Sequence, residues 1–218
     1  MSSIVWVKRG IIMNSINPFP IIFKDKFDFN FNSFKWKADE FIKMAEDKIV
    51  NENLKTPEHG GVTTVVMNQQ HPPHSWEELQ PFLEWMYPRV DKVWETWNCK
   101  PMEKYLADSW INVHPNNAYT EAHHHQGVTV AVAAYLQVPK DSGRLLVENP
   151  LLSYKKGEPL DYYYWDKEMN YSPIEVETND VLFFPGWLTH KTEKSKATTD
   201  RYVMSLNIMG NWINDRSI

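Results

Sequence analysis

The fold class follows from the stretch Val128–Val138, which reads VTVAVAAYLQV. One parity of this stretch is aliphatic throughout, whereas the other contains Thr129, Tyr135 and Gln137 among alanines. Successive side chains of a β-strand point to opposite faces of its sheet, so the alternation predicts a strand with two unlike faces. We expect the aliphatic face to pack on a core and the more polar face to line the mouth of the fold.

Other segments in the second half of the chain have the same character. Arg201–Met209 alternates more sharply. Its polar residues Arg201, Ser205 and Asn207 share one parity, and the other parity is apolar throughout. Three shorter strands are predicted, separated by turn-rich stretches: Asp108–His114, Arg144–Glu148 and Asp180–Pro185.

Two amphipathic helices are predicted in the first half. Ala38–Val50 carries apolar residues at helical spacing opposite charged ones. The second helix is expected to begin at Ser75, where Glu78 follows three residues later in a capping-box arrangement. Its apolar stripe reaches Trp97, but Pro88 lacks a backbone N–H and is expected to split the helix into two pieces.

Helices followed by several short strands predict a mainly β protein. The expected architecture is an antiparallel sandwich or barrel whose apolar outer face is covered by the N-terminal helices. At 218 residues the chain has the length of a single domain, 1–218. We expect residues 1–105 to form an N-terminal extension with helices and residues 106–210 to form the β core that carries the functional site.

Composition narrows the class of function. Lys and Arg number 23 and Asp and Glu number 28, and the resulting net charge of -5 argues against a protein that binds nucleic acid through counterion release. Cys99 is the only cysteine, so no internal disulfide can form. No apolar run approaches the roughly 18 residues of a membrane span. We therefore expect a cytoplasmic protein with no nucleic-acid or membrane partner.

Three of the eight histidines are consecutive: His123, His124 and His125. In an extended segment the outer two project to the same side, so they can share one metal ion. Taken alone, the triplet is more typical of an exposed histidine run before a strand. His190 strengthens the metal hypothesis, because the apolar segment from Asp180 ends in Pro-Gly and would deliver this histidine to the mouth of a barrel.

Arg201 opens the second alternating strand on its polar face. A buried guanidinium needs an anionic partner, because an unpaired charge in that position is costly. A ligand carboxylate would satisfy it through two parallel hydrogen bonds, and an internal Asp or Glu would satisfy it equally well. The strand pattern leaves both partners open.

Three motifs occur in a fixed order: His123-x-His125, then Phe183-Phe-Pro-x-Trp-Leu-x-His190, then Arg201 with Ser205 and Asn207. This order resembles the 2-oxoglutarate and Fe(II)-dependent oxygenases, in particular a group common in marine bacteria and their phages. The resemblance covers roughly Pro18 to Asn207 and includes Gly60-Gly61, Trp110-Ile-Asn112, Tyr135-Leu-Gln-Val-Pro139 and Ser142-Gly143. It implies a double-stranded β-helix (jelly-roll, cupin-like) core with the helices packed on one sheet.

The resemblance also implies a set of site residues. His123 and His190 would bind Fe(II), and Arg201 would anchor the C5 carboxylate of the cosubstrate 2-oxoglutarate. Asn112, Ser205 and Tyr135 are candidates for further cosubstrate contacts, and each is equally plausible as a structural polar group.

The chain departs from the family pattern at one ligand. The superfamily usually has Asp or Glu two residues after the first histidine, in a two-His, one-carboxylate triad, whereas this chain has His125 there. Either His125 is a third imidazole ligand, or a carboxylate such as that of Glu121 takes the position. In a third register His125 is the first ligand and Gly127 occupies the carboxylate position. We favour His123, His125 and His190 together, a set that would also suit Zn(II).

The function implied is that of a dioxygenase that hydroxylates a substrate while converting 2-oxoglutarate to succinate. A non-catalytic cupin-like binding module is the alternative from another class, and a three-His dioxygenase without a cosubstrate is the alternative among enzymes. Neither alternative requires a cation at Arg201. The sequence identifies neither the prime substrate, because specificity in such folds lies in variable loops, nor the oligomeric state.

Overall fold

The structure is a computed structural model that describes residues 22–67, 70–150 and 170–211. The two ends of the expected domain, 1–21 and 212–218, lie outside the described residues. Across the described part of the chain, no helix combines the length and the apolar character that crossing a membrane requires.

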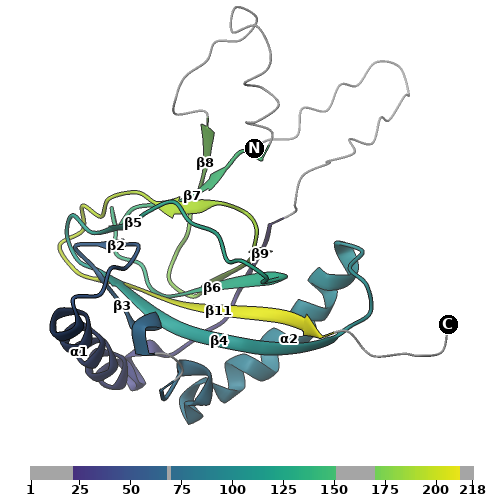
Figure 1. The fold of residues 1–218 in the computed structure, drawn as a ribbon, viewed down its shortest axis with the longest axis horizontal. Coiled ribbons are helices and arrows are strands. Elements are labelled where there is room, and N and C mark those ends of the chain that lie inside the picture. Colours follow the sequence, from purple (N-terminus) through teal and green to yellow (C-terminus); the bar gives the residue numbers. More distant parts are fainter. Residues whose placement is uncertain (1–21, 68–69, 151–169, 212–218) are drawn as a thin grey trace, which may run out of the picture.

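A six-stranded antiparallel sheet, the main sheet, forms the centre of the molecule (Figure 1). Its strands in spatial order are β1 (Phe23–Lys26), β9 (Asp180–Pro185), β6 (Val130–Gln137), β11 (Arg201–Asn211), β4 (Glu103–His114) and β3 (Val62–Thr63). The long strands β11 and β4 pair from Arg201 opposite His114 to Asn211 opposite Glu103, with a register shift after Asn207.

Two smaller sheets lie on one side of the main sheet. The first contains β10 (His190–Thr192), β7 (Leu145–Glu148) and β8 (Tyr171–Ile174), and the second pairs β2 (Glu58–His59) with β5 (Tyr119–Thr120). Figure 1 shows them across the main sheet from the two α-helices. The molecule is therefore a mainly β jelly-roll with helices packed on one sheet, as the sequence predicted.

The helices are α1 (Lys35–Glu52) and α2 (Gln80–Thr96). Short 3-10 turns connect them to the strands: η1 (Phe31–Ser33), η2 (Thr64–Met67), η3 (Pro73–Ser75) and η4 (Glu77–Leu79). Both helices lie against the outer face of the main sheet (Figure 1). They bury aromatic and aliphatic side chains there, and Phe82 is fully buried.

Strand β6 shows why the main sheet separates two cores. Its even-numbered residues, from Val130 to Leu136, belong to the core under the helices, together with Met204 and Leu206 of β11. Ala131, Ala133 and Tyr135, on the other parity, belong to a second core between the sheets. The predicted alternation is confirmed, and both of its faces are buried.

Two predictions about the second helix are wrong. Helix α2 runs through Pro88 without a break, because Pro88 lies on the exposed face, where water can solvate the carbonyl that loses its partner. The capping box does not form either. The hydroxyl of Ser75 donates to the Pro72 carbonyl, and the Glu78 carboxylate accepts from Lys37 instead.

Strand boundaries also differ from those predicted. The predicted strand 128–138 is trimmed to 130–137, because a turn at 126–127 precedes it and Gly127 takes a φ of +78° there. Strand β4 begins at Glu103, before the predicted 108. The 180–185 strand has the predicted bounds.

Candidate metal centre

Two of the candidate ligands are joined by their main chains. The N–H of His123 donates to the carbonyl of His190 at 3.0 Å, and the N–H of His190 donates back at 2.9 Å. The N–H of His125 donates to the carbonyl of Gly186 at 2.8 Å. The start of β10 and the turn that follows β9 thus hold the two ends of the histidine triplet.

Gly186 makes this arrangement possible. A Cβ atom at this position would lie 2.3 Å from the carbonyl oxygen of Val128, much closer than non-bonded atoms approach. Only glycine therefore lets the turn lie flat against the segment that follows the triplet. The glycine of the Pro185-Gly186 pair is therefore the local cause of this close approach.

Each candidate ligand has one ring nitrogen engaged with an oxygen. His123 Nδ1 lies 2.8 Å from the Glu121 carbonyl, His190 Nδ1 lies 2.8 Å from the Leu188 carbonyl, and His125 Nδ1 lies 2.6 Å from Oδ1 of Asn207. These acceptors require a proton on Nδ1, so the Nε2 lone pair of every ring is free for a metal ion.

The three rings face one another. Their centroids are 4.3 Å apart for His123 and His190, 5.1 Å for His125 and His190, and 5.4 Å for His123 and His125. One ring nitrogen from each lies within 4.8 Å of the other two. Because a metal–imidazole bond is about 2 Å long, small side-chain movements suffice for all three to share one ion.

The environment keeps the imidazoles of His125 and His190 neutral. Burial lowers the pKa of His190 to about 3 and that of His125 to about 4. A histidine must be deprotonated to bind a metal, so both rings are in the required form at neutral pH.

The alternative ligands lie elsewhere. The Glu121 carboxylate pairs with His59 Nε2 at 2.7 Å and is more than half exposed. His124 is exposed, and Gly127 lies in the turn before β6. Among the residues that the structure describes, the group that could hold a metal ion contains His123, His125 and His190.

A cavity of about 270 Å³ opens beside the three histidines, on the inner face of the main sheet. The seven site residues that the sequence favoured line it: Asn112, His123, His125, Tyr135, His190, Arg201 and Ser205. They come from five parts of the chain, and the alternation of β4, β6 and β11 turns their side chains to the same face. Burial raises the pKa of the Tyr135 phenol to about 12, so this group is uncharged at neutral pH.

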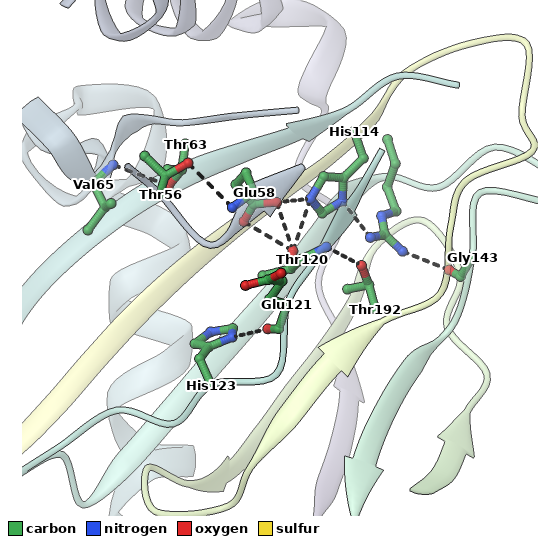
Figure 2. Close-up of polar contacts among 11 residues, drawn as sticks. Thr56, Glu58, Thr63, Val65, His114, Thr120, Glu121, His123, Gly143 and Thr192 are labelled. Atoms are coloured by element: carbon green, nitrogen blue, oxygen red, sulfur yellow. Dashed lines mark hydrogen bonds and ion pairs between the residues drawn. The ribbon is translucent and has the colours of Figure 1, made fainter. Parts of the chain in front are cut away.

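Arg201 is 1% exposed and belongs to a buried polar network. Its guanidinium donates to the Gly143 carbonyl at 2.7 Å and to Nδ1 of His114. The other ring nitrogen of His114 donates to the Glu58 carboxylate, which also accepts from the hydroxyl of Thr120. Figure 2 shows Glu58, His114 and Thr120 pointing toward one another.

The sequence left open whether an internal carboxylate partners Arg201. Such a carboxylate, Glu58, is present, but it does not contact Arg201 directly. His114 separates Glu58 from Arg201, and Arg201 Nε has no hydrogen-bond partner within the described ranges. Burial lowers the pKa of His114; the hydrogen bond to Glu58 opposes this, and the charge of Arg201 reinforces it. The neutral His114 imidazole therefore links a buried carboxylate, that of Glu58, to a buried cation, the Arg201 guanidinium.

Among the cavity residues that sequence reasoning missed are Glu58, Asp108, His114 and Thr120. Asp108 and His114 share the parity of Asn112 on β4, so the alternation that pointed to Asn112 could have found them. Glu58 and Thr120 lie on two-residue strands that carry no periodic signal.

Comparison with known proteins finds a family model that matches the second half of the chain. Residues 108–207 match the family described as "Putative 2OG-Fe(II) oxygenase", where 2OG is 2-oxoglutarate. These residues form a 2OG-Fe(II) oxygenase domain. The cofactors of the oxygenase are those that the family name states, Fe(II) and 2-oxoglutarate, as the sequence predicted. Among curated proteins, a search found no sequence similar to the oxygenase.

Solved structures share its fold. A prolyl-4-hydroxylase from Pseudomonas putida superposes with a TM-score of 0.55 at 13% identity, over 86% of the oxygenase and 92% of that chain. A viral collagen prolyl hydroxylase from Paramecium Bursaria Chlorella virus-1, solved with 2OG, gives 0.50 at 12% identity, over 86% and 94%. The oxygenase spans 58% of a 2OG-Fe(II) oxygenase family oxidoreductase from Burkholderia pseudomallei, at 12% identity over 61% of its own length and a TM-score of 0.44.

Proposed function

We propose that the oxygenase hydroxylates a C–H bond of its substrate while oxidatively decarboxylating 2-oxoglutarate to succinate. In this proposal His123, His125 and His190 hold Fe(II), and Arg201 binds the distal carboxylate of the cosubstrate. The observation that carries the proposal is that three free imidazole nitrogens and one buried guanidinium line the same small cavity.

The residues fit both groups. Neutral imidazole is an ordinary ligand for Fe(II), and a facial set of three ligands leaves positions for a chelating cosubstrate and for dioxygen. Arg201 supplies the cation that a dicarboxylate needs, and its Nε has no hydrogen-bond partner among the described residues. The double charge of a metal held by neutral ligands also suits a dianionic cosubstrate.

The chain itself contributes binding and orientation. When bound, the iron supplies the oxidising chemistry. The Nδ1 contacts of the three histidines fix the direction of their Nε2 atoms. Glu58 and His114 hold the guanidinium of Arg201 from behind. Asn112, Ser205 and Tyr135 line the cavity, and we assign them to the walls of the cosubstrate site.

Succinate release tests this function. Purified protein with Fe(II), ascorbate and 2-oxoglutarate should release succinate at a slow uncoupled rate without its prime substrate. His190→Ala should reduce the rate to that of a metal-free control, because it removes the most buried ligand. His124→Ala is the matched control, since His124 is exposed and lies outside the cluster, and it should retain the parent rate. If iron is bound and no succinate appears, the activity is not that of a 2-oxoglutarate-dependent enzyme.

A further inference from the structure

The three candidate ligands include no carboxylate, because His125 stands at the position where the family usually has Asp or Glu. Asp108 nevertheless lies among the residues that line the same cavity. Asp108 lies on β4 directly opposite Asn207 on β11, at the point where the register of the two strands shifts. The cavity therefore contains a carboxyl group one strand away from the ligand cluster.

Asn207 connects this carboxyl group to the cluster. Its side-chain oxygen Oδ1 lies 2.6 Å from Nδ1 of His125 and accepts a hydrogen bond from the N–H there. Its side chain is also hydrogen-bonded to Asp108. Since the Oδ1 atom is used by His125, the amide NH₂ is the donor to the Asp108 carboxylate.

Among the described residues, the surroundings of Asp108 leave part of its carboxyl group without a nearby hydrogen-bond partner, so a more distant charge can influence its ionisation. Its Oδ1 atom is buried and has no hydrogen-bond partner in the described part of the chain. Burial raises the pKa of the Asp108 carboxyl, and the hydrogen bond from Asn207 opposes this. A divalent cation at the three histidines would favour the ionised carboxylate.

We propose that Asp108 and Asn207 are positioning residues that supply, through His125, the negative charge that a carboxylate ligand would otherwise bring to the metal. The chain of donors runs from His125 Nδ1 to Asn207 and from Asn207 to Asp108. It fixes the His125 ring, leaves Nε2 toward the metal and makes that nitrogen a stronger donor. The inference rests on the proposed role of His125 as a ligand.

The test measures the affinity of the metal-free full chain for Co(II). Binding is monitored through the visible absorption of the bound ion. Asp108→Asn keeps the shape of the side chain and removes the charge. It should weaken Co(II) binding about tenfold or more, the lower end of the effect typical of groups that orient metal ligands. Asp47→Asn is the matched control, because Asp47 is exposed on α1, and it should bind as the parent does.

The exchange variant Asp108→Asn/Asn207→Asp makes the test specific. It places the carboxylate directly against Nδ1 of His125, so it should bind Co(II) at least as tightly as the parent. A merely structural role for Asp108 would not predict this recovery. The exchange variant also provides the answer if Asp108→Asn alone fails to fold, because binding tenfold weaker than the parent would then overturn the proposal.

Two further results separate this inference from the proposed function. If folded Asp108→Asn binds Co(II) as tightly as the parent, the positioning role is wrong and the metal centre stands. If the parent and His190→Ala bind Co(II) equally, the metal centre itself is wrong. Thermal unfolding of every variant shows whether a change in affinity reflects loss of the fold.

Discussion

Arg201 is held in place by contacts that come from three distant parts of the chain. Gly143 offers a carbonyl from a loop, His114 offers a ring nitrogen from β4, and Glu58 lies behind that ring on a two-residue strand. A planar guanidinium with two of its nitrogens fixed has one orientation, and Arg201 lines the cavity in that orientation. This preorganisation is the reason to expect a cosubstrate anchor here.

We therefore expect Arg201→Lys to weaken 2-oxoglutarate binding while metal binding survives. Lysine keeps the charge but loses the planar fork. Arg201→Ala should weaken binding by roughly thirtyfold or more, since removing one partner of a desolvated charge pair costs about 2 to 5 kcal/mol. The charge-transfer band of the Fe(II) complex reports this affinity in a 2-oxoglutarate titration. Equal affinity in both folded variants would remove Arg201 from the cosubstrate site.

Site residues could be predicted from the sequence where a strand pattern or a motif placed them. The alternation of β11 placed Arg201 and Ser205 on a single face, and the histidine spacing suggested a metal cluster. Glu58 could not be found in this way. It meets His114 across 56 positions of sequence, and only the folded chain brings the two side chains together.

At the scale of elements, the long strands with unlike faces were predictable, as was the four-residue β7, whereas strands of two or three residues were not. Strands β6 and β11 extend over 8 and 11 residues, enough for a period of two to emerge. Strand β10 has three residues and β2 has two, so neither contains a pattern. Their places are set by pairing with partners far along the chain.

Pro88 in α2 supplies a prediction at this scale. Pro88→Ala should restore the helical hydrogen bond to the carbonyl of Glu84 and raise the free energy of unfolding by about 2 kcal/mol. For a chain of this size that corresponds to a rise in Tm of about 4 to 8 °C, measured by calorimetry. Lys92→Ala, an exposed substitution in the same helix, should change stability by less than about 0.5 kcal/mol. An unchanged or lower Tm for Pro88→Ala would show that the helix has adapted fully to the proline.

At the scale of the whole molecule, we propose that the chain is a single domain. The core under the helices contains Phe41 of α1, Phe82 of α2 and Val132 of β6, so the N-terminal helices and the strands share buried surface. Strand β1 also pairs with β9 along the edge of the main sheet. Removal of the N-terminal extension would expose the surface that the strands bury against it.

Metal binding should stabilise the whole molecule. At a free Co(II) concentration of about 100 times Kd, binding to the folded state adds about 2.7 kcal/mol to the free energy of unfolding. We expect Tm to rise by about 5 to 10 °C on Co(II) addition and to return when a chelator is added. His190→Ala should show no such rise. A comparable rise in that variant would place the bound ion at some other set of ligands.

The reciprocal main-chain bonds between His123 and His190 have a consequence for which ion the protein carries. Because the backbone brings the candidate donor atoms within 4.8 Å of one another before any ion is bound, small side-chain movements complete the proposed site for any divalent ion that imidazole accepts. Nitrogen donors then rank the divalent ions by the Irving–Williams order, in which Fe²⁺ stands below Co²⁺, Ni²⁺ and Cu²⁺. Iron occupancy therefore depends on the supply of competing ions around the protein, and enzyme exposed to them during purification will need its metal replaced before it is assayed.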